Sequence, residues 1–267
     1  MDIFANMNEM DYSCTSNEMD EWFGLGSPMF IFAVLMAYLL LIYKILPNYM
    51  EDREPYQLKT YIIVYNAMQM LSCIYIITGI FRIASTSVFH FWDCLLLDPN
   101  SYSEYLFNRV TYFTFWLKIS ELSETIVFVL RKKQNQVSYL HVFHHCSTVT
   151  LIYLLCTDYR GTSPLYPILL NSTVHVIMYG YYLASAVCDA ETIKRLTPIK
   201  KSITTIQMIQ FVLILIQAGF LMFRCEISKL VTTYYSIVVV VIFYGFYDFY
   251  NKAYKAANNS RISNKSS

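Results

Sequence analysis

Long apolar segments constrain the fold of this chain more than any other feature of its sequence. Hydrophobic residues make up 56% of its 267 residues and charged residues only 15%, whereas a soluble globular domain carries roughly 25% charged residues. A helix that crosses a bilayer needs about 20 mostly apolar residues. The sequence therefore predicts an all-α membrane protein with seven transmembrane helices, at about 26–46, 61–83, 110–130, 138–157, 164–187, 203–223 and 231–250.

These spans leave no segment for a soluble module, so residues 1–267 are expected to form a single polytopic domain. The net charge of +1 provides no basic surface that could neutralise the phosphates of a nucleic acid, and this excludes a nucleic-acid partner. The first 22 residues are acidic and polar, without the positive segment that opens a cleavable signal peptide.

The basic residues predict the orientation. With a lumenal N-terminus, fourteen of the twenty Lys and Arg residues fall in cytosolic segments, five fall on the other side and Lys118 lies within a span. Because basic residues accumulate on the cytosolic side, we expect a lumenal N-terminus and a cytosolic C-terminus. Cys94 and Cys225 would then share the lumenal side, where a disulfide can form; two free thiols are the alternative.

Polar residues recur at helical spacing in three consecutive spans, and each set shares one helix face. Because ionisable groups are costly at membrane depth, we expect these faces to meet inside the bundle. A fourth set, on the sixth span, either joins helices through amide hydrogen bonds or lines a substrate site. The sets are Lys118, Glu121 and Thr125; His141, His144 and His145; Asn171, His175, Tyr179 and Tyr182; and Thr204, Gln207 and Gln210.

Histidine carries protons, binds metals and can act as a nucleophile, so the cluster leaves several functions open. A di-iron oxidase needs several histidine boxes, and this chain has five histidines in all. A single zinc ion held by His141, His145, His175 and Glu121 is compatible in ligand type. A seven-span receptor is the non-enzymatic alternative, but it has no need for a histidine cluster. We expect no metal.

Four ordered motifs resemble the ELO-type very-long-chain fatty acid elongases, whose first motif is K-x-x-E-x-x-D-T followed by L-R-K-K. Glu124 stands where that family usually has Asp. The motifs are Lys118-Ile-Ser-Glu121-Leu-Ser-Glu124-Thr125 with Leu130-Arg131-Lys132-Lys133, Leu140-His141-Val-Phe-His144-His145, Asn171-Ser-Thr-Val-His175-Val-Ile-Met178-Tyr179-Gly-Tyr181-Tyr182, and Lys200-Lys201-Ser-Ile-Thr204-Thr-Ile-Gln207-Met-Ile-Gln210-Phe211.

The resemblance implies the condensing step of fatty acid elongation in the endoplasmic reticulum membrane. Acyl-CoA and malonyl-CoA would give a 3-oxoacyl-CoA, CO2 and CoA, without a cofactor. The expected partners are membrane lipid and the ketoacyl-CoA reductase, dehydratase and enoyl reductase of the elongation cycle. A homo-oligomer is also compatible with the resemblance. His144 would attack the acyl thioester to form an acyl-imidazole; direct condensation of the two substrates is the alternative.

The remaining roles follow from the same resemblance. We expect His141, His145, His175, Asn171 and Glu121 to complete the catalytic set, and Lys118, Thr125, Tyr179, Tyr182, Thr204, Gln207 and Gln210 to bind substrate. Basic residues at cytosolic helix ends would contact CoA phosphates, although the ordinary positive-inside bias accounts for most of them: Arg131, Lys132, Lys133, Lys200, Lys201 and Lys252. An inner bundle would surround an acyl tunnel lined by residues such as Met208, Phe211, Phe220, Tyr235, Phe243 and Tyr247.

Overall fold

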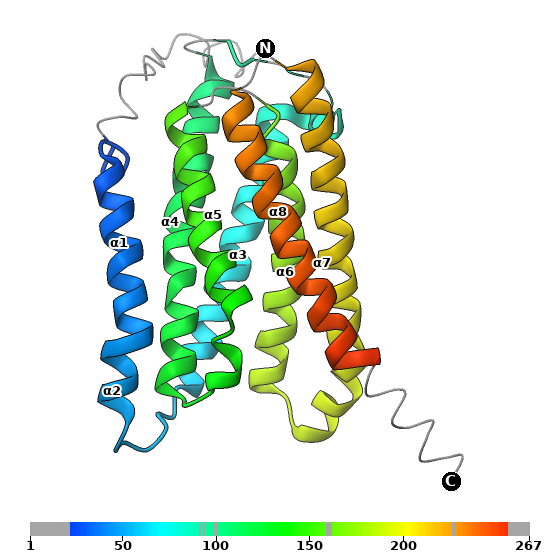
Figure 1. The fold of residues 1–267 in the computed structure, drawn as a ribbon. Coiled ribbons are helices and arrows are strands. Elements are labelled where there is room, and N and C mark those ends of the chain that lie inside the picture. Colours follow the sequence, from blue (N-terminus) through cyan, green and yellow to red (C-terminus); the bar gives the residue numbers. More distant parts are fainter. Residues whose placement is uncertain are drawn as a thin grey trace, which may run out of the picture.

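The computed structural model describes residues 22–90, 92, 94, 96–98, 101–158, 162–225 and 228–255, and its regular elements are helices. A π-helical turn, η3 (Leu41–Ile45), joins the first two helices into one rod at the edge of the bundle (Figure 1). The expected lumenal segment 1–21 and the tail 256–267 lie outside the described residues. The helices are α1 (Pro28–Leu40), α2 (Leu46–Met50), α3 (Lys59–Ala84), α4 (Tyr102–Leu130), α5 (Tyr139–Asp158), α6 (Leu165–Val187), α7 (Ala190–Arg224) and α8 (Lys229–Tyr250).

Five helical segments are long and apolar enough to cross a membrane, among the residues that the structure describes. They coincide with the first, second, fourth, sixth and seventh predicted spans: Pro28–Met50, Lys59–Ala84, Tyr139–Thr157, Pro198–Arg224 and Lys229–Tyr254. The third and fifth predicted spans are also helical, as α4 and α6, but are not among these five. In α4 the charged residues Lys118, Glu121 and Glu124 interrupt the apolar run.

Two helices begin well before the predicted spans. α4 starts at Tyr102 instead of about residue 110, because the hydroxyl of Ser101 accepts a hydrogen bond from the Glu104 amide at 3.1 Å. α7 starts at Ala190 instead of about residue 203, and the carboxylate of Asp189 caps its first turn. Such caps satisfy amides that lack a partner inside the helix. Hydropathy marks only the apolar part of a helix and misses these polar first turns.

Six helices close into a ring around the interior of the bundle. α3 packs against α4 and α6, α5 packs against α4 and α8, and α7 packs against α6 and α8. α1 lies outside this ring, against α5 (Figure 1). Large apolar side chains cover the outer surface, as a lipid environment requires; examples are Val64, Met68, Ile209, Val240 and Phe249.

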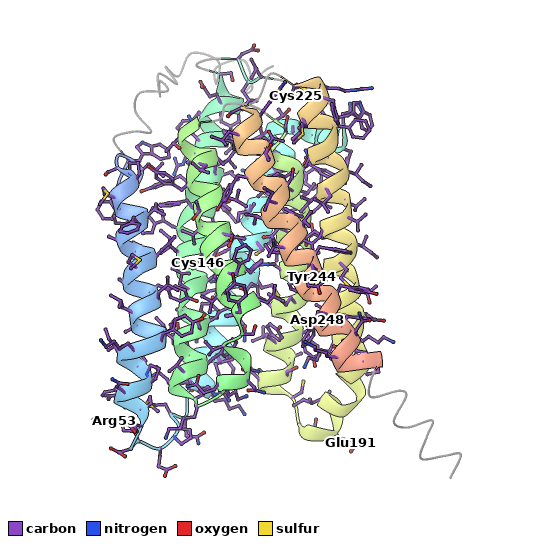
Figure 2. The ribbon with its side chains drawn as sticks, viewed as in Figure 1. Arg53, Cys146, Glu191, Cys225, Tyr244 and Asp248 are labelled. Carbon is purple, nitrogen blue, oxygen red and sulfur yellow. A yellow bond between two sulfur atoms is a disulfide. The ribbon has the colours of Figure 1, made fainter. Side chains whose placement is uncertain are left out.

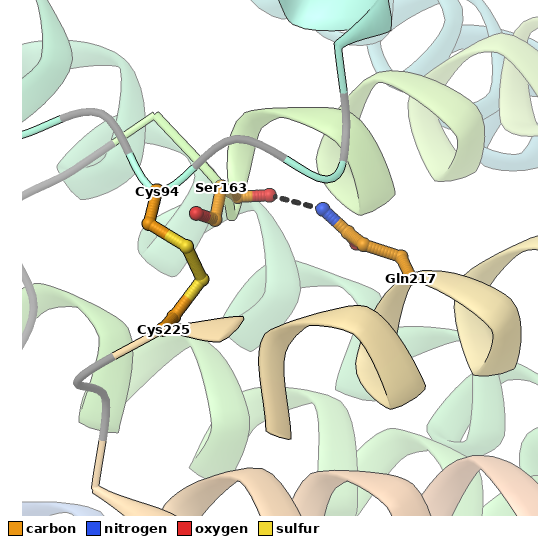
Figure 3. The surroundings of a disulfide bond; sticks show 4 residues. All are labelled: Cys94, Ser163, Gln217 and Cys225. Atoms are coloured by element: carbon orange, nitrogen blue, oxygen red, sulfur yellow. Dashed lines mark hydrogen bonds between the residues drawn. A yellow bond between two sulfur atoms is a disulfide. The ribbon is translucent and has the colours of Figure 1, made fainter. Parts of the chain in front are cut away.

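The two ends of the bundle differ in chemistry. One end carries the α4–α5 and α6–α7 connections and the last turn of α8, with Arg131, Lys200 and Lys252; we call it the basic end. In Figure 2 Arg53 and Glu191 lie at this end and Cys225 at the opposite one. There a disulfide joins Cys225 to Cys94, with Cα atoms 5.6 Å apart (Figure 3). We call this the disulfide end.

Loss of this disulfide should destabilise the fold. Cys94→Ser is expected to lower the free energy of unfolding by about 2–5 kcal/mol, because a cross-link over a long loop restricts the unfolded chain. The bridged cysteines are 131 residues apart. Thermal unfolding in detergent measures the effect, and Cys188→Ser is the matched control, since Cys188 is free and exposed. Equal melting temperatures for the two variants would contradict the prediction.

Candidate active site

One face of α4 carries polar side chains into the ring. Lys118, Glu121 and Thr125 follow one another at spacings of three and four residues, which places them on one side of the helix. All three are buried, and Glu121 and Thr125 have no exposed surface. A buried charge requires a partner with good geometry, so the contacts of this face locate the site.

Lys118 and Glu121 form a buried ion pair that extends to α6. Nζ of Lys118 donates to both carboxylate oxygens of Glu121, at 2.8 and 3.0 Å, and to Oδ1 of Asn171 at 3.0 Å. Nδ1 of His175 lies 3.5 Å from Oε1 of Glu121, and its Nε2 lies 3.3 Å from Nδ2 of Asn171. Because Asn171 and His175 are one helical turn apart, the four side chains form one contiguous cluster, in which His175 approaches Glu121 without a hydrogen bond at Nδ1.

Glu124 lies between two tyrosines and a histidine. The hydroxyl groups of Tyr179 on α6 and Tyr65 on α3 donate to the same oxygen, Oε1, at 2.6 and 3.1 Å. The other oxygen, Oε2, lies 3.6 Å from Nε2 of His145. Both carboxylate oxygens of Glu124 therefore have contacts inside the site.

Tyr65 is a site residue that the sequence interpretation missed. It shares one face of α3 with Gln69 and Cys73, at successive intervals of four residues. Gln69 donates to the hydroxyl of Ser120 on α4 at 2.9 Å, and Cys73 is buried. This stripe is weaker in polarity than the stripes of histidines and carboxylates, but its helical spacing is a signal that could have identified Tyr65.

A hydrogen-bond chain holds His141 and reaches α1. Nε2 of His141 lies 2.9 Å from the hydroxyl of Thr125, which lies 2.7 Å from the hydroxyl of Tyr38. Tyr38 is buried although α1 is outside the ring. α1 thus supports the site by fixing the side chains that orient one of its histidines.

The three histidines of α5 have different surroundings. The rings of His141 and His145 lie 4.3 Å apart, and those of His144 and His145 lie 5.4 Å apart. His141 contacts Thr125, and His145 faces Glu124. Within the part of the chain that the structure describes, no side chain hydrogen-bonds to the His144 ring, which lines a cavity instead. His144 is therefore the histidine of α5 whose ring is available to a substrate.

A cavity of about 490 Å³ lies between the helices of the ring, a size in the usual range of small-molecule sites. His144, Lys118, Asn171 and Gln210 are among its polar lining side chains, and we call the part that they line the polar end. The rest of the lining is mostly apolar and extends to the disulfide end, with Leu96, Ser163, Leu221 and Ser228. Of the six side chains expected to line a tunnel, Phe211 and Tyr235 line this cavity; its lining does not include Met208, Phe220, Phe243 and Tyr247.

Three side chains come close enough together to hold a metal ion. The ligand atoms of Glu124, His141 and His145 all lie within 4.8 Å of one another. The zinc hypothesis from the sequence instead combined His141 and His145 with Glu121 and His175. Glu121 is paired with the Lys118 cation, which would repel a metal ion there. The structure thus groups Glu124, and not Glu121, with the two histidines.

The stripe on α7 divides between different surroundings. Gln210 is buried and lines the cavity. Gln207 lies outside the lining and its amide contacts Sδ of Met178 at 3.7 Å. Thr204 is buried and donates to the carbonyl of Lys200 in its own helix. On α6, Tyr179 is buried in the site, but Tyr182 is 43% exposed.

The basic candidates lie at the basic end and not in the site. Lys132, Lys133, Lys200, Lys201 and Lys252 are exposed, and Arg131 is partly buried. Three of them have contacts that compete with a ligand: Lys132 donates to the carbonyl of Glu51 at 3.2 Å, Lys252 pairs with Asp248 at 2.7 Å, and Nζ of Lys201 lies 5.7 Å from the centre of the Tyr250 ring. The structure therefore gathers these cations at one end of the bundle without fixing them around a single point.

The arrangement suits chemistry at the carbonyl end of a long apolar molecule. The imidazole of His144, which has no hydrogen-bond partner among the described residues, stands at the polar end of this largely apolar cavity. The fixed amide of Asn171 and the Lys118 cation line the same end. Such groups stabilise negative charge that develops on a carbonyl oxygen, while an imidazole can attack the carbonyl carbon.

Comparisons with known proteins find similarity over most of the chain. The profile of the ELO family, described as GNS1/SUR4, matches residues 23–262. The chain is similar to a very long chain fatty acid elongase of Aedes aegypti, with 31% identity over 247 residues, 90% of the chain and 67% of the relative. Very long chain fatty acid elongase F of Drosophila melanogaster is 32% identical over 250 residues, which cover 90% of the chain and 95% of that relative. Very long chain fatty acid elongase 1 of Mus musculus is 34% identical over 198 residues, which cover 71% of the chain and 67% of that relative.

Proposed function

The chain belongs to the ELO family of very long chain fatty acid elongases, and from this premise we propose that it catalyses the condensing step of elongation. An acyl-CoA and malonyl-CoA, with one proton, give a 3-oxoacyl-CoA two carbons longer, CO2 and free CoA. This makes it a 3-oxoacyl-CoA synthase. The observation that carries the proposal is the position of His144, unpaired among the described residues, at the polar end of the apolar cavity.

In the first half-reaction a ring nitrogen of His144 attacks the thioester carbonyl carbon of the acyl-CoA. The C–S bond breaks and the thiolate of CoA leaves, taking up the proton that the imidazole loses. The amide of Asn171 and the Lys118 cation, which share the polar end of the cavity, stabilise the carbonyl oxygen as it becomes negative. The product is a neutral acyl-imidazole on His144.

In the second half-reaction malonyl-CoA loses CO2, and the electron pair of the broken C–C bond forms an enolate. The enolate carbon attacks the acyl-imidazole carbonyl, the C–N bond breaks, and His144 recovers a proton. His145 and His141, fixed by Glu124 and Thr125, act as proton carriers near this step. Direct condensation of both substrates, with His144 as a base only, is the alternative to the covalent route.

We further place the protein in the endoplasmic reticulum membrane with seven spans, a lumenal N-terminus and a cytosolic C-terminus. α4 and α6 would cross along with the five apolar segments, because their polar side chains face the ring and not lipid. The basic end suits the cytosol, and the disulfide end suits an oxidising lumen. Products would pass to a ketoacyl-CoA reductase, a dehydratase and an enoyl reductase, and no cofactor takes part in condensation.

The two ends of the site suit the two ends of an acyl-CoA. The CoA phosphates would approach from the basic end, where Lys200 and Lys201 are exposed on α7. The acyl chain would occupy the cavity. Along α8 and its N-cap residue the lining runs from Ile242 to Ser228, which is about 21 Å at a helical rise of 1.5 Å per residue. An extended alkyl chain advances about 1.25 Å per carbon, from its bond length and angle, so this stretch of the lining alone spans about sixteen carbons.

Blocking the far end of the cavity should shorten the preferred substrate. Val231 lines that end, and Val231→Phe is expected to lower kcat/KM for the longest accepted acyl-CoA about tenfold relative to shorter ones, since overpacking costs about 1–3 kcal/mol. A chain-length panel measures the ratio. Val240→Phe is the control because Val240 is 51% exposed and outside the lining. An unchanged chain-length profile would place the acyl chain elsewhere.

Turnover by purified protein tests the function. Protein in lipid nanodiscs receives labelled malonyl-CoA and a panel of saturated and unsaturated acyl-CoAs, and the expected product is a 3-oxoacyl-CoA two carbons longer than the primer. Release of CO2 without a primer would indicate decarboxylation alone. No condensation by folded protein across the panel would overturn the proposal and direct attention to a metal at Glu124, His141 and His145, which metal analysis of the same sample would detect.

A further inference from the structure

Tyr235 is a partly buried side chain that brings a hydroxyl group into the mostly apolar part of the cavity. It lies on α8 and lines the cavity together with Val238, Val239 and Ile242. Its hydroxyl oxygen is buried and, among the described residues, has no hydrogen-bond partner. A hydroxyl in such surroundings is unfavourable unless something satisfies it. The role proposed for the polar end of the cavity does not involve this side chain.

The position of Tyr235 along the cavity can be estimated from helix packing. Gly245 of α8 lies against Leu140 of α5, and the two helices run antiparallel (Figure 1). Along α5, His144 lies four residues beyond Leu140 toward the disulfide end. Along α8, Tyr235 lies ten residues from Gly245 in the same direction. The Cα atom of Tyr235 therefore lies about 9 Å deeper than that of His144, at a rise of 1.5 Å per residue.

The directions of the two side chains increase this separation. Side chains on a helix tilt toward its N-terminus, so His144 tilts toward the basic end and Tyr235 toward the disulfide end. An acyl chain whose carbonyl carbon is at His144 advances about 1.25 Å per carbon. It would therefore pass the Tyr235 hydroxyl at about its eighth to twelfth carbon, in the middle of a long chain.

We propose that Tyr235 selects acyl chains that carry an electron-rich acceptor at this depth, either a cis double bond or an in-chain hydroxyl group. A saturated chain offers only C–H groups and leaves the phenol hydroxyl without a partner. A double bond accepts a weak O–H···π contact, and a chain hydroxyl accepts a full hydrogen bond. This selectivity rests on the proposed elongase activity and adds to it a class of preferred substrate.

A positional series of acyl-CoAs tests the proposal. The substrates are octadecanoyl-CoA, octadecenoyl-CoA isomers with the cis double bond moved from the sixth to the thirteenth carbon, and the matching hydroxyoctadecanoyl-CoAs. For the wild-type protein we expect kcat/KM to peak where the acceptor meets Tyr235, about two- to fivefold above the saturated chain for a double bond. The hydroxyl series would peak at the same depth with a larger ratio.

Two variants make the test specific. Tyr235→Phe keeps the ring and is expected to abolish the peak and to raise kcat/KM for octadecanoyl-CoA, because the unsatisfied hydroxyl is gone. Tyr234→Phe should leave the profile unchanged, since Tyr234 is 37% exposed and outside the cavity lining. A profile without a peak, or a peak that survives in Tyr235→Phe, would overturn the selectivity. Failure of the folded wild-type protein to elongate any member of the series, saturated, unsaturated or hydroxylated, would instead overturn the elongase function.

Discussion

His144→Ala is expected to lower kcat/KM for condensation by about 10³-fold or more, because it removes the group that attacks the thioester or moves its protons. Of the four histidines in the site, His144 is the one in the cavity lining. His141, His145 and His175 contact Thr125, Glu124 and Glu121 respectively, so their loss would also disturb those neighbours. The His144 substitution therefore reports most directly on chemistry.

Intact-mass measurement distinguishes the two mechanisms. Wild-type protein incubated with acyl-CoA alone should gain the mass of one acyl group and release one CoA, and His144→Ala should gain none. His90→Ala serves as the control, because His90 is exposed and lies outside the ring of helices. Full turnover by wild-type protein without a trapped acyl group would favour direct condensation, and near-normal turnover by His144→Ala would remove His144 from the chemistry altogether.

Lys118→Met is expected to destabilise the protein by about 3–5 kcal/mol and to abolish activity. It leaves the Glu121 carboxylate, which has no exposed surface, without its cation in the interior, and breaking a buried pair on one side has a cost of this size. The same substitution removes the donor to Oδ1 of Asn171. Thermal unfolding in detergent and the condensation assay measure the two effects separately.

A double variant separates stability from function. Lys118→Met with Glu121→Met removes both charges together, and replacing a buried pair by apolar side chains is often close to neutral for stability. We expect the double variant to recover most of the melting temperature but none of the activity. The exposed pair Lys252–Asp248 provides the stability control, and Lys252→Met should change the melting temperature little. If the double variant is as unstable as Lys118→Met, an uncompensated Glu121 charge is not the cause.

The polar stripes were predictable because helix periodicity is a local property. The spacing of Lys118, Glu121 and Thr125 places them on one face in any α-helix, and burial then directs that face inward. The cap that starts α7 at Asp189 lies in a polar segment without this apolar pattern, so the predicted span began too late. Composition and periodicity thus indicate the type and number of helices better than their first turns.

Tertiary packing brings together contact partners that the spacing of residues along the sequence does not reveal. Glu124 binds Tyr65 of α3 and Tyr179 of α6, and Thr125 contacts Tyr38 of α1, because the ring brings together residues far apart in the chain. The same packing places His144 in the cavity lining, whereas the neighbouring His145 faces Glu124. Aromatic residues of α7 and α8 look alike in sequence, yet Tyr235 lines the cavity and Phe243 does not.

Residue types and their spacing were enough to predict an apolar all-helical chain, its polar helix faces and the likeness of its motifs to one enzyme family. Each of these depends on residue type and on the fixed period of the α-helix. The folded arrangement was needed to show which helices close the ring, which residue each histidine contacts and which side chains line the cavity. These depend on contacts between segments far apart in sequence, and side-chain packing selects among arrangements that local periodicity leaves equivalent.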